Sequence, residues 1–238
     1  MSLTQDAIRA ALSQVIDPNT GKDLVISKSA KNIQINGADV ALDVELGYPA
    51  KSQIDPIREQ VIAAIRTIPG AGNVSANVFS KIVAHSVQRG VKLMSNVRNI
   101  IAVASGKGGV GKSTTAVNLA LGLAANGIST GLLDADIYGP SMPRMLAVKE
   151  KPESLDGKQL KPIERYGLRT MSIGYIVNED TPMIWRGPMV SSALEQMLRD
   201  VQWGELDVLV VDMPPGTGDA QLTLAQRVAL SGAVIVST

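Results

Sequence analysis

The sequence predicts an α/β protein, in which a parallel sheet covered by helices is preceded by a small α+β domain. Three observations support this fold class. From Asn99 onward, apolar strand-like runs alternate with helix-forming stretches, as they do in parallel sheets. A segment rich in glycine and lysine, residues 106–114 (GKGGVGKST), stands between the first such strand and the first such helix. Before Asn99, two helical periods enclose a hairpin signal.

Length and composition limit the classes of function. The chain has 238 residues, enough for one large domain or two smaller ones, and we divide it into a domain at 1–88, a linker at 89–98 and a domain at 99–238. A net charge of +1 and an aromatic content of 3% favour neither nucleic acid nor a membrane as partner. Cysteine is absent, which excludes disulfides and thiolate metal sites within these residues. Without a signal peptide or a long apolar run, we expect a cytoplasmic protein.

The small domain is expected to combine two helices with three strands. Apolar residues from Leu3 to Ile16 recur at helical spacing, and Asp17-Pro18 ends that run. Asn36-Gly37 is a dipeptide suited to a type I′ hairpin turn. The expected strands lie at residues 32–36, 38–46 and 74–78, and the second helix at 54–68.

In the larger domain, four buried strands and a helix after the glycine-rich segment are expected. The strands lie at residues 99–104, 129–133, 207–211 and 233–237, and the helix at 113–126. Because a parallel strand needs neighbours and covering helices, the apolar strand just before Thr238 predicts a sheet that is incomplete at the C-terminus of this sequence.

Between the second and third of these strands lies a long insertion. Its first part, residues 149–165, is polar and rich in lysine and proline, so we expect a surface loop or lid. Ser192 to Glu195 (SALE) forms a capping-box pattern. This pattern predicts a helix that opens at Ser192 and ends near Trp203-Gly204.

The segment GKGGVGKST is a Walker A phosphate loop, which predicts that the chain binds a nucleoside triphosphate and has the fold of a P-loop NTPase. Its amides and the N-terminus of the following helix favour phosphate oxygens. Lys112 is expected to reach the β- and γ-phosphates, and Ser113 to offer its hydroxyl to Mg²⁺. The remaining candidate nucleotide-binding residues are Gly106, Lys107, Gly108, Gly109, Val110, Gly111 and Thr114.

Acidic residues after two later strands supply candidates for the metal and for catalysis. Asp212 ends the run VLVVD and is expected to hold Mg²⁺, while the Gly216 amide is a candidate sensor of the γ-phosphate. Asp136 is a candidate for orienting the attacking water, and Asp134 for supporting the metal shell. The alternatives are a buried aspartate that caps a turn, for Asp212, and solvated loop carboxylates, for Asp134 and Asp136.

Lys107 has no task within its own loop once Lys112 binds the phosphates. One interpretation is that it acts on the nucleotide of a partner subunit, as an arginine finger does, an effect worth roughly 10³ to 10⁵ in rate. The alternative is an ordinary surface lysine.

Four segments together resemble the Mrp/ApbC-type iron-sulfur cluster carrier ATPases, a branch of the deviant Walker A class. They are GKGGVGKST, DADIYGPSMP from Asp134, TPMIWRGPMV from Thr181 and VVDMPPGTGDAQLTLAQ from Val210. The N-terminal domain resembles the small iron-sulfur assembly domain that is often fused to these carriers. The resemblance implies an ATPase that uses ATP and Mg²⁺, forms a face-to-face homodimer with Lys107 acting in trans, and delivers a [4Fe-4S] cluster to apo iron-sulfur proteins.

The same resemblance implies cluster ligands that this sequence does not contain. In the family, a Cys-x-x-Cys pair beyond the position of Thr238 holds the cluster between subunits, and these 238 residues have no cysteine to replace it. Two other interpretations therefore stay open. One is a partition-type spatial switch driven by ATP, and the other is a fragment that binds nucleotide without turnover.

Overall fold

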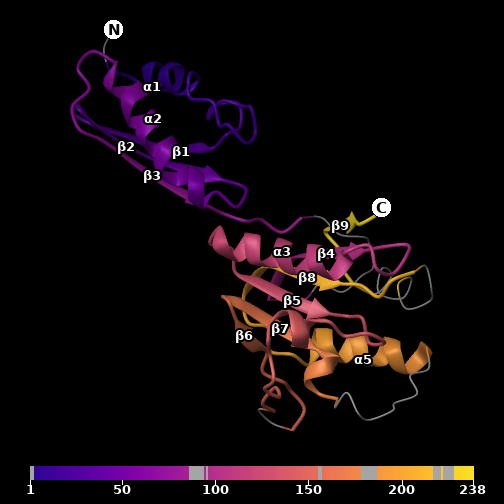
Figure 1. The fold of residues 1–238 in the computed structure, drawn as a ribbon. Helices are drawn as coiled ribbons and strands as arrows, with labels where there is room; N and C mark the ends of the chain where they lie inside the picture. Colours follow the sequence, from indigo (N-terminus) through magenta and orange to yellow (C-terminus); the bar gives the residue numbers. More distant parts are fainter. Residues whose placement is uncertain are drawn as a thin grey trace. The chain divides into compact units, whose positions relative to one another are not determined.

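The computed structural model describes residues 3–85, 94, 96–154, 157–177, 187–216, 221 and 228–238. The chain divides into two compact units, Met1–Ile82 and Val83–Thr238, which Figure 1 shows in indigo to purple and in magenta to yellow. The first unit ends before residue 88, the boundary expected from the sequence. The larger sheet already begins at Val97, within the expected linker.

The first unit is a three-stranded sheet with two helices. Strands β1 and β2 are antiparallel, whereas β2 and β3 are parallel, and the sheet order is β1-β2-β3. The elements are α1 (Gln5–Leu12), β1 (Ala30–Asn36), β2 (Asp39–Leu46), the single 3₁₀ turn η1 (Lys51–Gln53), α2 (Ile54–Arg66) and β3 (Val74–Ser80).

Alternating and helical apolar periods meet in the core of this unit. The side chain of Thr4 caps α1 by accepting a hydrogen bond from the Ala7 amide at 3.2 Å. Both helices bury one face, and every second residue of β2 is buried. The fully enclosed core residues include Ile8, Leu12, Val44, Ile57, Val61 and Ile65.

Two expectations for this unit are wrong in detail. Asn36 pairs with Asp39, so the hairpin turn consists of Gly37 and Ala38. Only Gly37 has a positive φ, of +62°, and a type I′ turn requires positive φ at both central residues. Helix α1 ends at Leu12, with Ser13 as its C-cap, and not at Asp17; the Asp17 carboxylate lies beyond the helix and accepts hydrogen bonds from the Asn19 amide and the Tyr48 hydroxyl.

The second unit contains a six-stranded sheet in the order β6-β7-β5-β8-β4-β9. All neighbours are parallel except β6 and β7, so the expected parallel sheet is confirmed. Helix α3 packs against β4, β5 and β8 (Figure 1). The elements are β4 (Val97–Ala104), α3 (Lys112–Ala125), β5 (Thr130–Asp134), α4 (Met142–Met145), β6 (Ile163–Arg165), β7 (Leu168–Ser172), η2 (Ile173–Tyr175), α5 (Gly187–Arg199), β8 (Leu206–Asp212) and β9 (Gly232–Ile235).

The insertion departs most from expectation. Residues 149–165 do not form only a loop, because β6 lies at their end, and β7 follows as a further strand paired with β5. Helix α5 begins at Gly187 and ends at Arg199. The capping-box interpretation is therefore wrong, since Ser192 lies inside the helix.

Different side chains lie at the two ends of strands β4, β5 and β8. Where these strands begin, the Asp207 carboxylate accepts hydrogen bonds from the Ser129 amide at 3.1 Å and from the Arg98 guanidinium. Their carboxyl ends lie side by side, with Asp212 paired to both Val103 and Asp134. In open parallel sheets ligands bind beyond the carboxyl ends of strands.

Among the described helices, none is long and apolar enough to cross a membrane.

Candidate functional site

The phosphate loop connects β4 directly to α3. Gly109 and Gly111 have φ values of +78° and +87°, in the left-handed region that side chains other than glycine disfavour. Gly111 precedes the first residue of α3, and no side chain caps that end of the helix. A Cβ built on either glycine would meet no atom within 4 Å, so the loop faces open space. Uncapped amides around such a space are suited to phosphate oxygens.

Lys112 and Asp212 form a buried ion pair at this loop. The Lys112 Nζ lies 2.5 Å from Asp212 Oδ1 and 3.2 Å from the Ser113 hydroxyl. The side chains of Lys112 and Asp212 are 7% and 0% exposed. The second carboxylate oxygen of Asp212 is buried and has no hydrogen-bond partner among the described residues. Because such an atom is costly to leave unsatisfied, Asp212 has one oxygen available for a further ligand.

The donors around Asp212 fit Mg²⁺ bound together with a nucleotide. A carboxylate oxygen and a hydroxyl, supplied by Asp212 and Ser113, are the hard oxygen ligands that Mg²⁺ prefers. Within the described ranges, no group of three or more histidines or carboxylates surrounds a possible metal position. That also suits nucleotide-bound Mg²⁺, which typically takes one or two protein carboxylates and fills its shell with phosphates and water.

Asp134 is held entirely by protein donors. One of its oxygens accepts hydrogen bonds from the Ser141 and Met142 amides and the Ser172 hydroxyl, at 3.0, 3.1 and 3.0 Å, and the other accepts from the Asp136 amide at 3.2 Å. Burial raises the pKa of Asp134 to about 6, with a further contribution from the nearby charge of Asp212, while these hydrogen bonds act in the opposite direction. Its expected part in the metal shell stays a prediction, and the structure gives it other partners.

Lys107 and Asp136 follow the carboxyl ends of β4 and β5 and so lie at the same end of the parallel strands. The Asp136 carboxylate accepts a hydrogen bond from the Gly139 amide at 3.3 Å. Burial raises its pKa, and the positive charge of Lys112 partly offsets that rise, which places Asp136 within electrostatic reach of the phosphate loop. Lys107 is exposed, and its carbonyl accepts a hydrogen bond from the Ser105 hydroxyl at 2.9 Å. An exposed side chain suits both interpretations of Lys107.

The segment after β8 turns back onto β4. The Met213 amide donates to the Val103 carbonyl, and the Gly216 amide donates to the Ser105 carbonyl, each at 2.9 Å. Sensing of the γ-phosphate by Gly216 stays a prediction, and it requires this last hydrogen bond to open. Residues 181–186, 217–220 and 222–226, from two of the motifs quoted above, lie outside the described residues.

Two family models match the chain, one in each unit. The family model described as "NUBPL iron-transfer P-loop NTPase" matches residues 96–238, and the model described as "Iron-sulfur cluster assembly protein" matches residues 5–78. The chain belongs to the iron-sulfur cluster carrier family of P-loop NTPases.

Several members of the carrier family are closely similar to the chain. An iron-sulfur cluster carrier protein of Synechocystis is 44% identical over 99% of this chain and 68% of its own length. The corresponding protein of Escherichia coli strain K12 is 52% identical over 84% of this chain and 55% of its own length. The iron-sulfur cluster transfer protein NUBPL of Dictyostelium discoideum is 60% identical over 61% of this chain and 46% of its own length. The chain thus spans roughly half to two thirds of these relatives.

One solved structure of a related protein carries a nucleotide. It is a nucleotide-binding protein in complex with ADP from Archaeoglobus fulgidus, 41% identical to the chain, with a TM-score of 0.50. The match covers 60% of this chain and 55% of that protein.

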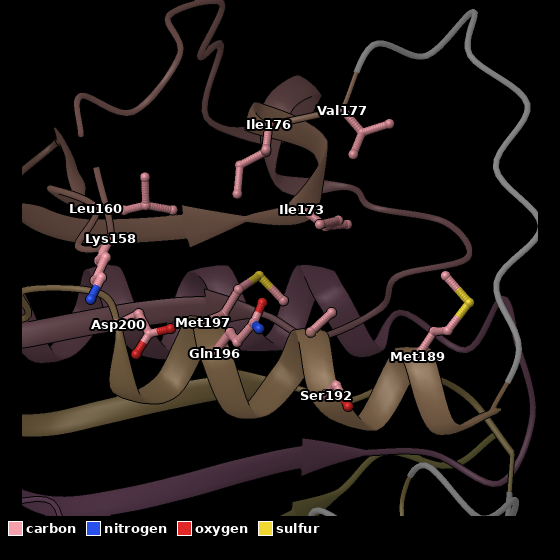
Figure 2. Close-up of a pocket in the computed structure, with 11 residues that line it drawn as sticks. Lys158, Leu160, Ile173, Ile176, Val177, Met189, Ser192, Gln196, Met197 and Asp200 are labelled. Atoms are coloured by element: carbon pink, nitrogen blue, oxygen red, sulfur yellow. The ribbon is translucent and has the colours of Figure 1, made fainter. Parts of the chain in front are cut away.

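Away from the phosphate loop, a cavity of about 660 Å³ lies between α5 and η2. Figure 2 shows Ile173 and Ile176 of the η2 region facing Met197 of α5, with Lys158 and Asp200 at one end. None of the expected site residues lines it. The cavity is therefore distinct from the phosphate loop.

Sequence reasoning missed Ser172 and the amides of Ser141 and Met142. The role of Ser172 depends on β7 lying next to β5, and β7 was not expected as a strand. Ser141 and Met142 belong to the quoted segment DADIYGPSMP, but their amides carry no signal in the side-chain pattern.

Proposed function

We propose that this chain is the ATP-binding and ATP-hydrolysing portion of an iron-sulfur cluster carrier, active as a homodimer in the cytoplasm. The observation that carries the proposal is the buried Lys112–Asp212 pair at the phosphate loop, in which one Asp212 oxygen has no partner among the residues described. Membership of the carrier family and the ADP named for the Archaeoglobus protein support it.

Hydrolysis of ATP at this site would rest on positioning and on neutralising charge. Lys112 and the loop amides bind the phosphates, and Ser113 and Asp212 would hold Mg²⁺, which supplies further positive charge there. Asp136 accepts a hydrogen bond from the attacking water and so orients it toward the terminal phosphate. Lys107 of a second copy adds positive charge where negative charge develops in the transition state.

The described residues do not fit an iron-sulfur cluster. Such clusters are typically held by cysteine thiolates, and the 238 residues contain no cysteine. We therefore assign no cluster-binding step to this chain. Delivery of [4Fe-4S] clusters to apo iron-sulfur proteins belongs to the proposal only through ligands that lie outside this sequence.

The test measures Mg-ATP binding and hydrolysis by the chain at several protein concentrations. The wild type is compared with Lys112→Ala, Lys107→Ala and the exposed control Lys151→Ala. We expect Lys112→Ala to lose binding, whereas Lys107→Ala should bind ATP but turn over roughly 10³- to 10⁵-fold more slowly. The wild-type rate per molecule should rise with concentration, because each site needs a partner.

Three results would overturn parts of this proposal. A folded wild-type chain without affinity for Mg-ATP would refute the nucleotide site itself. Equal rates for Lys107→Ala and the wild type would refute the action of Lys107 in trans, and binding without turnover would identify the chain as a nucleotide-binding fragment.

A further inference from the structure

The geometry points to Asp134 as a positioning residue that fixes the loop carrying Asp136, and to Ser172 and Gly174 as the residues that anchor this loop to η2. This inference rests on the proposed ATPase function and assigns to Asp134 a task other than metal binding. The segment in question is residues 135–142, which comprises the connection after β5 and the first residue of α4 and is called the Asp136 loop below.

Asp134 binds the Asp136 loop at both of its ends. Near the start of the loop, one carboxylate oxygen accepts a hydrogen bond from the Asp136 amide at 3.2 Å. At its end, the other oxygen accepts from the Ser141 and Met142 amides at 3.0 and 3.1 Å. The Ser172 hydroxyl, at 3.0 Å, donates to the same oxygen as Ser141 and Met142. Asp134 is fully buried, and each of its oxygens accepts at least one hydrogen bond from the protein.

Asp212 contrasts with Asp134 in the same row of the sheet. The two residues are paired across β5 and β8, and both are 0% exposed. Asp212 has one oxygen without a partner in the part of the chain that the structure describes, whereas each oxygen of Asp134 already has at least one protein donor. The metal-binding capacity of this acidic pair therefore lies with Asp212, and Asp134 organises the backbone beside it.

Ser172 extends the same network to η2. Its hydroxyl donates to Asp134 and also accepts a hydrogen bond from the Gly174 amide at 3.1 Å, so it caps η2. The turn η2 in turn packs closely against the Asp136 loop. A Cβ at Gly174 would lie 2.8 Å from Pro143 Cγ, in α4, and 3.0 Å from Pro140 Cβ, in the loop, so Pro143 at the end of the loop would have to shift and Pro140 would be crowded. The loop is thus held by a hydrogen-bond network through Ser172 and by close packing against Gly174.

The position of the Asp136 carboxylate depends on these contacts. Its own amide is bonded to Asp134, and its carboxylate is bonded to the Gly139 amide within the loop. A displacement of about 1 Å at a catalytic group can cost about 10²-fold in rate. Loosening the loop should therefore lower turnover while leaving the phosphate loop, and hence nucleotide affinity, unchanged.

The experiment compares Ser172→Ala, Ser172→Thr, Gly174→Ala and Asp134→Asn in the full chain, with Asp212→Asn as the reference for loss of a metal ligand. Gly122→Ala is the matched control for Gly174→Ala, because Gly122 lies in α3 and a Cβ there would meet no atom within 4 Å. For each variant, kcat, the ADP dissociation constant and the Mg²⁺ concentration for half-maximal activity are measured. Amide hydrogen exchange at Ser141 and Met142 gives a readout that does not depend on activity.

We expect Ser172→Ala and Gly174→Ala to lower kcat roughly tenfold or more, with ADP affinity and Mg²⁺ dependence within about twofold of the wild type. Ser172→Thr, which keeps the hydroxyl, should restore most of the rate. In Ser172→Ala and Asp134→Asn, the Ser141 and Met142 amides should exchange faster by roughly tenfold, because their acceptor is loosened or lost. Gly122→Ala should match the wild type in every measurement.

Three outcomes would overturn the inference. One is a shift in Mg²⁺ dependence for Asp134→Asn that equals the shift for Asp212→Asn, with Ser172→Ala unaffected, since this would make Asp134 a metal ligand. A second is wild-type kcat in both Ser172→Ala and Gly174→Ala. A third is unchanged exchange at Ser141 and Met142 in Asp134→Asn. Should the wild type itself lack ATPase activity, the proposed function fails, while the exchange measurement still decides the role of Asp134 in holding the loop.

Discussion

Replacing Lys112 by alanine should destabilise the second unit even when no nucleotide is added. Lys112 provides the only charged partner that the structure shows for the described Asp212 carboxylate, at 2.5 Å, and both side chains are buried. Removing one member of a buried ion pair typically costs about 3–5 kcal/mol, because the other charge stays in a region of low polarity. The variant is therefore expected to lose stability as well as phosphate binding.

Urea unfolding followed by tryptophan fluorescence measures this cost selectively. Both tryptophans of the chain, Trp185 and Trp203, belong to the second unit, so the signal reports that unit. With a slope of about 2 kcal/mol per molar urea, the expected loss lowers the midpoint by about 1.5–2.5 M. The control is Lys161→Ala, which breaks a 3.8 Å ion pair with Glu153 on the surface and should cost less than about 1 kcal/mol.

The double variant Lys112→Ala/Asp212→Ala makes the reasoning refutable. Without the Asp212 carboxylate no buried charge is left unpaired, so the double variant should be more stable than Lys112→Ala alone. A double-mutant cycle should give a coupling energy of at least about 1 kcal/mol. If Lys112→Ala shifts the midpoint no more than Lys161→Ala, or if the two changes are simply additive, the pair does not stabilise the fold as argued.

Three further predictions concern the cores of the two units and a surface carboxylate. Gly131→Ala should destabilise the second unit by about 1–3 kcal/mol, measured by urea unfolding, because its Cβ would lie 2.6 Å from a leucine methyl group of β8; an unchanged midpoint would contradict this. Tyr48→Phe should destabilise the first unit by about 1–3 kcal/mol, since it removes the 2.8 Å hydrogen bond to buried Asp17. The native NMR signals of the first unit should then disappear at a lower urea concentration than in the wild type, whereas those of the second unit should disappear at the same concentration. The hydrogen bond from Lys31 lowers the pKa of Glu45, so Glu45 helps stability above its unfolded pKa and loses that contribution as the pH falls; an NMR titration in which Lys31→Ala leaves this pKa unchanged would show that the cause is wrong.

The sequence predicted those parts of the fold that local pattern determines. Strands β4, β5, β8 and β9 consist largely of apolar residues, and the glycines of the phosphate loop need conformations that few other residues adopt. The position of Asp212 follows from the same pattern, because it ends a buried strand directly beside β4. Fold class and family are confirmed on this basis.

Other features depend on contacts between distant segments and were not predictable from local pattern. Strand β7 contains the polar residues Arg169 and Thr170, and it becomes a strand because it pairs with β5. Asp134 resembles a loop carboxylate in sequence, yet it is fully buried, since Ser141 and Ser172 are brought to it by the fold. Helix α5 begins before Ser192 because a helix does not have to start at a capping pattern.

The cluster around Asp207, where strands β4, β5 and β8 begin, has a practical consequence. There Asp207 joins the beginnings of three neighbouring strands through Ser129 and Arg98. The length of β8 separates this cluster from Lys112 and Asp212, which lie at the carboxyl ends of the strands. Substitutions that tighten or loosen this cluster are thus a means of adjusting thermal tolerance independently of nucleotide chemistry. Engineers who want a sturdier version for crystallisation can begin at Asp207 and leave the reactive groups as they are.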